Sequence, residues 1–340
     1  MPNLDARNML GSIEMLPKQC QDAWQAMKKI KLPKTYKAIN KVAVFGMGGS
    51  IIGMDVIKNL FSAEIKIPVI LVNDYQIPAR IDNNTLAILS SYSGSTEETV
   101  AAAKNILRKT KKVFVITSGG YLAKFAAQHN LPAYIINPRF NPCNQPRIAL
   151  GYSVVSQIAL LSKLNVLKVT EKDINNLARF LSAQQKKQKK QTLNLAKKIK
   201  NHILILAASE FLLGNAHVMA NQINENGKNF AAYFPIPELN HHLMEGLSNP
   251  KSNKNNLFFI FLNSSLYHSR VKKRYAITQK VLEKNSIKYF EQTENAKNKL
   301  LQSFSILQWG AFLSFYLAIA NKIDPSPIPW VNYFKDALKK

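Results

Sequence analysis

Cysteine is rare in this sequence, and its placement argues against a metal centre and against a disulfide framework. Cys20 and Cys143 are the two cysteines among 340 residues, and neither stands in a C-x-x-C pair. The adjacent residues His241 and His242 have no cysteine near them, so a structural zinc site is not expected. We expect two free thiols in a reducing compartment, which favours a cytoplasmic location, and we expect no metal or other cofactor.

Acidic residues are also scarce. Asp and Glu number 20 against 46 Lys and Arg, and the formal net charge is +26. An excess of this kind is the first criterion for nucleic-acid binding. The basic residues are nevertheless spread along the chain, with the main cluster at 186–190, and no helix-turn-helix, zinc-finger or aromatic-basic strand pattern accompanies them. We interpret the charge as a solvated surface that can attract anionic substrates, and we do not expect a nucleic-acid partner.

Long apolar runs are missing as well, although 46% of the residues are hydrophobic. Residues 305–320 come closest to a membrane span, but the run is short and Gln308 and Trp309 interrupt it, so a buried helix is expected there. Residues 1–7 lack the charged-then-apolar pattern of a signal peptide. We expect no membrane partner, and the apolar residues suffice for the cores of two domains of ordinary size.

The apolar residues fall into two similar series of strands and helices. In the first series, the strand-like runs lie at 41–45, 67–72, 86–90, 113–117 and 132–136. In the second series, the strand-like runs lie at 202–207, 257–262 and 287–290, and helices are expected near 211–224, 268–284 and 297–321. Strands that alternate with helices predict an α/β fold in which each sheet is mostly parallel and flanked by helices.

The two series suggest two tandem domains that arose by internal duplication. We predict a helical N-terminal extension at 1–35 and a first domain at 36–165. A basic, Gln- and Lys-rich segment at 166–200 is expected to form one or two exposed helices that link the halves, and 201–340 is expected to form the second domain.

Four Ser and Thr residues and a glycine stand close together where the run 86–90 ends. The stretch Ser91-Tyr92-Ser93-Gly94-Ser95-Thr96-Glu97-Glu98-Thr99 opens the helix-like run 100–107. Side-chain hydroxyls and backbone N–H groups can converge at such a strand-to-helix turn, and the helix N-terminus favours negative charge. The alternative is an ordinary capping box, in which Thr96 caps the helix and the side chain of Thr99 or Glu98 forms the reciprocal hydrogen bond to the N-cap backbone. On this stretch alone, both interpretations stand.

A second turn of the same kind follows the run 41–45. It reads Gly46-Met47-Gly48-Gly49-Ser50 and leads into another helical pattern. The glycine spacing does not match the dinucleotide fingerprint G-x-G-x-x-G, and no Gly-Lys-Ser/Thr follows as in a P-loop. A tight turn with Ser50 at or near a helix start remains, which by itself is common in doubly wound folds.

The pairing of these two turns resembles the sugar isomerase (SIS) domain family, and most closely the bifunctional phosphoglucose/phosphomannose isomerases, which carry two such domains in tandem. The resemblance extends in order along the chain from about residue 40 to its end. Its further motifs are 144–152 (NQPRIALGY), 222–226 (QINEN), 238–241 (ELNH) and the tail from 324 (DPSP) through Lys335.

The resemblance and the position of the turns imply one phosphate-binding cradle. Ligands of open α/β sheets bind beyond the carboxyl ends of the strands, where both turns lie. The expected cradle residues are Ser50, Ser91, Ser93 and Thr96, with the backbone of Gly48 and Gly49. Ser95 stands where relatives usually carry Asn, a change that a turn position accepts.

The resemblance also implies four catalytic residues. Glu225, near the end of a helical pattern, is expected to carry a proton between two sugar carbons, and Arg147 to stabilise the oxyanion that develops. His241 and Lys335 are expected to open the sugar ring, with His242 as the rival histidine. In such isomerases this histidine comes from the neighbouring subunit, which implies a homodimer.

We therefore expect an aldose–ketose isomerase that interconverts glucose 6-phosphate, and mannose 6-phosphate, with fructose 6-phosphate through a cis-enediolate. The alternative is a sugar-phosphate-sensing regulatory protein that uses the same fold without catalysis. Amino-sugar synthesis by transamidation is disfavoured, because it would need a glutaminase domain with an N-terminal cysteine, which Cys20 inside a helical pattern does not supply.

Overall fold

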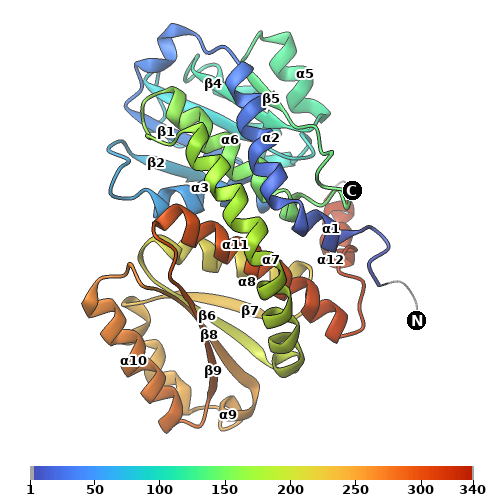
Figure 1. Cartoon of the computed structure of the whole chain (residues 1–340). Coiled ribbons are helices and arrows are strands. Elements are labelled where there is room, and N and C mark those ends of the chain that lie inside the picture. Colours follow the sequence, from blue (N-terminus) through green and yellow to red (C-terminus); the bar gives the residue numbers. More distant parts are fainter. Residues whose placement is uncertain (1–3, 339–340) are drawn as a thin grey trace.

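The computed structural model describes residues 4–338, which fold into two α/β halves stacked one above the other (Figure 1). Within that range there are twelve α-helices, nine β-strands and five short 3-10 helices. Each half contains one sheet, and every strand pair in both sheets is parallel. The predicted fold class is confirmed.

The first sheet has the strand order β2-β1-β3-β4-β5. Its strands are β1 (Lys41–Phe45), β2 (Val69–Val72), β3 (Thr85–Ser90), β4 (Val113–Thr117) and β5 (Ala133–Ile135), close to the predicted runs. The helices of this half are α3 (Gly49–Leu60), α4 (Glu97–Ile106), α5 (Gly120–Gln128) and α6 (Leu150–Lys163), with the 3-10 helices η1 (Lys34–Lys37) and η2 (Pro146–Ile148).

Both faces of this sheet are buried, because successive side chains of a strand point to opposite faces. Val42 and Val44 of β1 belong to the core that contains α3 and α6. Ala43 and Phe45 belong to a second core that contains α4 and α5. Since β1 leads into α3 and β3 leads into α4, the chain departs to opposite faces from two adjacent strands. This topological switch point opens a crevice at the carboxyl edge of the sheet, between the two turns singled out above.

The second sheet has the order β7-β6-β8-β9, which repeats the first four positions of the first sheet. Its strands are β6 (Ile203–Ala208), β7 (Ala231–Pro235), β8 (Leu257–Ser264) and β9 (Lys288–Glu294). Its helices are η3 (Glu210–Leu212), α8 (Leu213–Glu225), η4 (Glu238–His241), η5 (Leu243–Ser248), α9 (Asn253–Asn256), α10 (Ser269–Lys284), α11 (Lys299–Ala320) and α12 (Pro329–Ala337).

The sequence analysis missed β7. This edge strand begins with two alanines and ends at Pro235, and both residue types are depleted in strands. Its side chains are mostly only half-buried, so an apolar run does not mark it. The other three strands of this half lie where they were predicted.

Helix α11 is long and apolar enough to cross a membrane by length and composition, but 83% of its apolar window is buried inside the protein. Trp309 stacks on Phe290 of β9, with ring centroids 6.1 Å apart. These are the features of a core helix, and they confirm the buried helix expected around 305–320.

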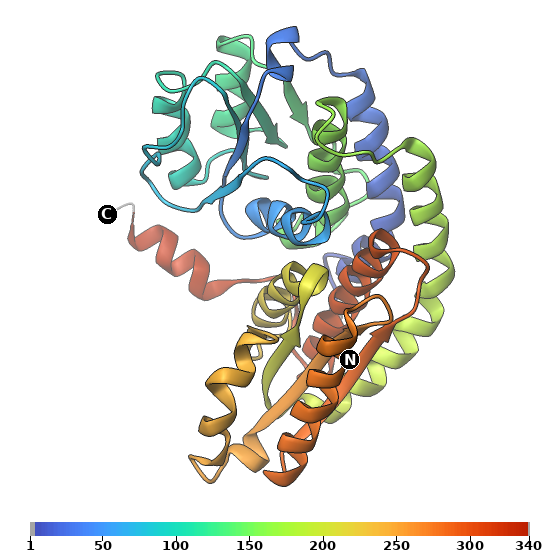
Figure 2. The same cartoon turned by 90° about the vertical axis from the view of Figure 1, so that its left-hand side faces the viewer.

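The segment between the halves was only partly predicted. It is one 29-residue helix, α7 (Glu171–Ile199), which starts with a capping box formed by Thr170 and Asp173. The expectation of an exposed linker is wrong, because Leu177, Leu181 and other residues on one stripe are buried. Figure 2 shows α7 lying along both halves, so it braces them together.

The predicted N-terminal helices are α1 (Met9–Glu14) and α2 (Leu16–Lys29). Buried Gln19 of α2 donates hydrogen bonds to the carbonyl oxygens of Phe140 and Ile148 and accepts one from the N–H of Gly151. The extension therefore supports the segment that carries Arg147.

The two halves meet through α3 and α8. His217 of α8 lies 2.8 Å from the Asp55 carboxylate of α3. Gly214 allows the close approach, since a Cβ there would lie 2.7 Å from the Cα of Val56. Gln222, near the end of α8, donates to the carbonyl oxygen of Arg147, which itself lies against the start of α3. The two helices are therefore antiparallel, and the end of α8 lies close to the switch point of the first sheet.

Candidate active site

The hydroxyl groups of the Ser-rich turn form one hydrogen-bonded cluster. Ser91 Oγ lies 2.8 Å from Thr96 Oγ1 and 3.4 Å from Ser93 Oγ, and it accepts the N–H of Gly94. Thr96 is the N-cap residue of α4, but its side chain makes no capping hydrogen bond. The capping-box interpretation of this stretch is therefore wrong, because the Thr96 hydroxyl is turned towards Ser91.

The glycine turn joins this cluster from the neighbouring strand. Ser50, in the first turn of α3, accepts the N–H of Tyr92 at 3.1 Å, and the Ser90 hydroxyl donates to the carbonyl of Ser50. Gly48 has a φ of 50°, a left-handed conformation that glycine adopts without strain. The four predicted cradle hydroxyls thus lie at the switch-point crevice, with the N-termini of α3 and α4 beside them.

Glu225 is the last residue of α8, and the asparagines on either side fix it. The Asn224 side chain pairs with both the N–H and the carbonyl of Ala231, the first residue of β7. Asn226 is fully buried, donates to Ser314 Oγ and accepts from Arg147. The helix end is therefore tied to the sheet on one side and to Arg147 and α11 on the other.

Arg147 is buried and nearly saturated with hydrogen bonds. Its Nε donates to Asn226, its Nη1 donates to Gln145, and its Nη2 donates to the carbonyls of Pro325 and Ser326, the last three at 2.6, 2.9 and 2.9 Å. A guanidinium has five N–H groups, so one on Nη1 remains. The same Nη1 lies 3.7 Å from the Glu225 carboxylate. Arg147 therefore mainly fixes Asn226, Gln145 and the 325–326 backbone, and a single N–H donor is left for a ligand.

The electrostatics of Glu225 combine burial with three surrounding cations. Its side chain is 31% exposed. Burial raises the pKa of the Glu225 carboxyl, while Arg147, Lys228 and Lys335 oppose that rise. Burial also lowers the pKa of the Arg147 guanidinium, and Glu225 opposes that change. A carboxylate with a raised pKa is suited to proton transfer near neutral pH.

Arg147 connects the carboxylate to the hydroxyl cluster. A Cβ on Gly49 would lie 3.2 Å from the carbonyl oxygen of Pro146 and 3.4 Å from the Cα of Arg147. The glycine turn thus contacts the backbone of the same residue whose side chain faces Glu225. One backbone segment therefore contacts the glycine turn of the first half and carries the side chain that faces the Glu225 carboxylate of the second half.

His241 lies away from this convergence. Helix α8 starts at the carboxyl edge of the second sheet and runs about 20 Å to Glu225 at the amino edge, given 1.5 Å per residue. Strand β7 then returns to the carboxyl edge, and η4 with His241 follows it. Asn240 is anchored on Thr278 of α10. Glu225 and His241 of one chain therefore lie at opposite edges of the sheet.

The two neighbouring histidines differ in their contacts. His241 is exposed, and its side chain makes no hydrogen bond within residues 4–338. His242 is engaged with Glu238, with Nε2 and Oε2 2.6 Å apart. His241 is thus the one available to meet a ligand.

Lys335 lies on α12, the C-terminal helix, in which no residue is buried. Figure 2 shows α12 projecting from the body of the protein, on the side away from α7. Lys335 nevertheless favours ionisation of Glu225, which places it within electrostatic range of the carboxylate. The apolar residues Trp330, Tyr333 and Phe334 of the same helix are more than half exposed.

The sequence analysis missed Lys228, which follows the Asn-Glu-Asn element and whose Nζ donates to the carbonyl oxygen of Glu225. A lysine three residues after a candidate base was the available signal. No group of three metal-ligating side chains occurs in the part of the chain that the structure describes.

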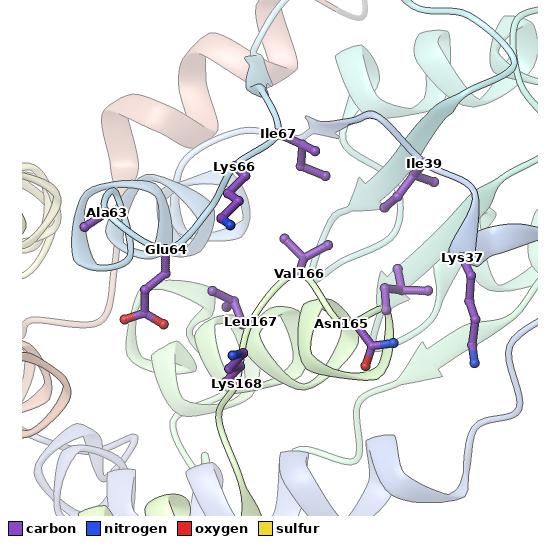
Figure 3. A pocket seen from close by; sticks show the side chains of 11 residues that line it. Lys37, Ile39, Ala63, Glu64, Lys66, Ile67, Asn165, Val166, Leu167 and Lys168 are labelled. Carbon is purple, nitrogen blue, oxygen red and sulfur yellow. The ribbon is translucent and has the colours of Figure 1, made fainter.

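A hollow of about 480 Å³ lies elsewhere, at the amino edge of the first sheet (Figure 3). Ile39, Ile67 and Val166 form its walls, and Lys37, Lys66 and Lys168 line its rim. Ile39 and Ile67 precede β1 and β2, so this hollow is at the edge opposite to the cradle. None of the residues that line this hollow belongs to the candidate site.

Comparisons with known proteins identify relatives of this chain. A model of the bacterial phospho-glucose isomerase C-terminal SIS domain matches residues 188–338. The chain is 32% identical to a bifunctional phosphoglucose/phosphomannose isomerase of Caldicellulosiruptor bescii, over 97% of this chain and 98% of that protein. It is 30% identical to the protein of the same name from Aquifex aeolicus, over 94% of this chain and 95% of that one.

Among solved structures, the C-terminal domain of glucosamine-fructose-6-phosphate aminotransferase from Francisella tularensis has the same fold. The TM-score is 0.70 at 14% identity, and the match covers 93% of this chain and 97% of that one. With near-full-length relatives at this identity, the chain belongs to the bifunctional phosphoglucose/phosphomannose isomerase family.

Proposed function

We propose that this protein is an aldose–ketose isomerase that interconverts glucose 6-phosphate and mannose 6-phosphate with fructose 6-phosphate. The observation that carries the proposal is the convergence of a four-hydroxyl cradle from the first half with the Glu225 carboxylate of the second half, through Arg147. Two relatives that are bifunctional phosphoglucose/phosphomannose isomerases support the same substrates.

The cradle binds the 6-phosphate in this proposal. Ser50, Ser91, Ser93 and Thr96 donate hydroxyls, and the backbone of Gly48 and Gly49 lines the crevice. The helix N-termini stabilise the phosphate charge without a metal ion. With the phosphate held there, the other end of the sugar extends towards Glu225.

Glu225 carries out the proton transfer. After His241 and Lys335 open the ring, the Glu225 carboxylate removes the proton on C2 of the open-chain aldose, and the C2–H electrons form the C1–C2 double bond of a cis-enediolate. The protonated Glu225 returns the proton to C1, the O2–H proton is lost, and O1 is protonated, which yields the ketose. Atoms and electrons balance within the sugar, so the steps need no redox cofactor.

Arg147 stabilises the enediolate in a limited way. Its positive charge lies beside the site, but only one N–H on Nη1 is left to donate. Mannose 6-phosphate differs in configuration at C2, and rotation of the enediolate would present either face to the same base.

We further propose a homodimer in which His241 of the partner subunit completes each site. The position of His241 at the edge opposite to Glu225 supports this, since one chain cannot bring the two together. The exposed apolar face of α12 beside the site is also suited to a partner surface. The unpaired, buried Cys20 and Cys143 are compatible with the cytoplasmic location expected from the sequence.

A coupled assay tests the proposal. The full-length protein is incubated with glucose 6-phosphate or mannose 6-phosphate, and fructose 6-phosphate is measured. Formation of fructose 6-phosphate from either sugar is expected. Binding of sugar phosphates by calorimetry with no turnover of either would contradict the proposal and favour the regulatory alternative.

A further inference from the structure

Lys228 occupies a backbone conformation that disfavours lysine. Its φ is 49°, in the left-handed region that glycine and asparagine prefer after a helix end. Lys322, which follows α11, is the comparable lysine, with a φ of 57°. Lys322 is exposed, whereas Lys228 is half-buried. Such strained residues persist where their surroundings impose them, and they concentrate at functional sites.

The contacts of Lys228 join three parts of the candidate site. Its Nζ donates to the carbonyl oxygen of Glu225 and, at 3.3 Å, to the carbonyl oxygen of Pro325. The Pro325 carbonyl also accepts from Nη2 of Arg147 at 2.9 Å. One ammonium group therefore bridges the end of α8 and the tail turn that holds Arg147.

Charged groups from three neighbouring segments act on this ammonium. Arg147 of η2 repels it, while Glu225 of α8 and Asp324 of the tail attract it. Burial, followed by Arg147, lowers the pKa of Lys228 to about 8. Backbone strain, burial and a nearby cation each make a charged lysine at this position unfavourable for folding. A residue that is retained despite all three is a candidate for a functional role.

We propose that Lys228 is a positioning residue of the isomerase site, whose charged Nζ ties the end of α8 to the 324–326 turn and so fixes Glu225 against Arg147. The proposal rests on the isomerase function proposed above. Loss of the Lys228 proton removes the charge of the ammonium and so weakens its hydrogen bonds to both carbonyls as the pH rises through the pKa of the lysine. We therefore expect the alkaline fall in kcat to reflect Lys228.

Three variants separate this role from a purely structural one. Lys228→Gly keeps the left-handed backbone and removes the ammonium. Lys228→Arg keeps a charge that does not titrate in the working range. Lys322→Gly is the matched control, because it relieves the same kind of strain at an exposed lysine that is not among the cations acting on Glu225.

The expected result is a fall in kcat of about 10- to 100-fold for Lys228→Gly, with KM within about twofold, because a misplaced base slows the chemical step more than binding. Lys228→Arg should restore most of kcat at pH 7 and move the alkaline fall to higher pH. Lys322→Gly should match the wild type. Wild-type kcat and an unchanged alkaline limb in Lys228→Gly would overturn the inference.

Thermal unfolding tests the bridge without turnover. The folded-state pKa of Lys228 is lowered, so the folded state binds fewer protons than the unfolded state between about pH 8 and 10, and stability rises with pH there. The Tm of Lys228→Gly minus that of the wild type should therefore be more positive at pH 7 than at about pH 9.5. For Lys322→Gly, the difference should not depend on pH. A pH-independent difference for Lys228→Gly would overturn the inference, whereas a wild type without turnover would instead contradict the proposed function.

Discussion

The two sheets share a strand order, but their switch points differ. In the first sheet, the turns after β1 and β3 present the hydroxyls of Ser50, Ser91, Ser93 and Thr96 to the crevice. In the second sheet, the equivalent turns follow β6 and β8, and the buried ring of Tyr267 lies between them. One switch point carries a cluster of hydroxyl groups, and the other is filled by an aromatic ring.

The filling of the second crevice is specific. Tyr267 packs edge-on against Phe211, with ring centroids 5.5 Å apart, and its hydroxyl accepts the N–H of Ser209. The Ser209 hydroxyl donates to the carbonyl of Ile236 at 2.6 Å and is not available to a ligand. The same topology therefore supports a site in one half and a sealed core in the other.

The second half contributes to the site from its other edge. Glu225 stands at the amino edge of the sheet, while the carboxyl edge carries His241. The rule that ligands bind at the carboxyl edge of a parallel sheet thus holds for the first half only. The second half is positioned so that a helix end, and not its own switch point, faces the candidate site.

The largest expected effect distinguishes Glu225 from Glu210, another glutamate of the second half. Glu225→Gln should lower kcat/KM by about 10²- to 10⁴-fold, because it removes the proton-transfer group and keeps the shape. Glu210→Gln, in the turn after β6 at the filled switch point, should remain within about twofold of the wild type. The coupled sugar-phosphate assay measures both variants. Comparable losses of activity would contradict the claim that the second half contributes to the site from the amino edge of its sheet and not from the carboxyl edge.

The next effect concerns the edge that carries His241. His241→Ala should lower kcat by about 10²-fold, since acid–base help with ring opening is lost. When this variant is unfolded and refolded together with Glu225→Gln, about a quarter of the wild-type activity should return, because half of the random dimers are mixed and one of their two sites is intact. Size-exclusion chromatography confirms the mixed dimers, and no recovery would place both residues in one subunit's site.

A smaller effect compares the serines of the two switch points. Ser91→Ala should raise KM for glucose 6-phosphate by about tenfold, the value of one charged hydrogen bond. Ser209→Ala should leave KM unchanged and reduce the free energy of unfolding by about 1 kcal/mol, because a buried hydrogen bond is lost. Steady-state kinetics and urea unfolding of both variants check this, and a raised KM in Ser209→Ala would show that the second crevice binds substrate.

The smallest effect is a displacement of the acid limb of the pH profile. Burial raises the pKa of Glu225, so the carboxylate needed as base is lost at a higher pH than for an ordinary glutamate. The acid limb of kcat/KM should therefore lie above about 4.3, the usual glutamate pKa. In addition, the free energy of unfolding of the wild type should fall as the pH rises from the usual glutamate pKa to the raised pKa of Glu225 in the folded state. Glu225→Gln should remove this dependence.

The parts of the molecule that local patterns encode were predictable. Eight of the nine strands in the described residues lie at the predicted apolar runs, and the cradle serines follow from where those strands end. The edge strand β7 was missed because alanines and a proline give no apolar signal. The buried stripe of α7 was hidden by its many lysines, which lie on the other side of the helix.

The parts that depend on tertiary packing were not predictable. Four N–H groups of Arg147 donate to Gln145, Asn226 and the tail. This arrangement depends on how the tail folds back, which the sequence does not show. The separation of Glu225 from His241 follows from the parallel β6–β7 pairing, and β7 itself was not foreseen. The role proposed for Lys228 depends on a left-handed backbone angle that the sequence does not reveal.

The most direct test of the central claim is the structure of the Glu225→Gln variant crystallised with fructose 6-phosphate. The account predicts the phosphate within hydrogen-bond distance of Ser50, Ser91, Ser93 and Thr96, and the substituted side-chain amide at position 225 about 3–3.5 Å from C1 and C2. A phosphate bound elsewhere, or sugar carbons far from position 225, would contradict the claim that the two halves converge on one substrate.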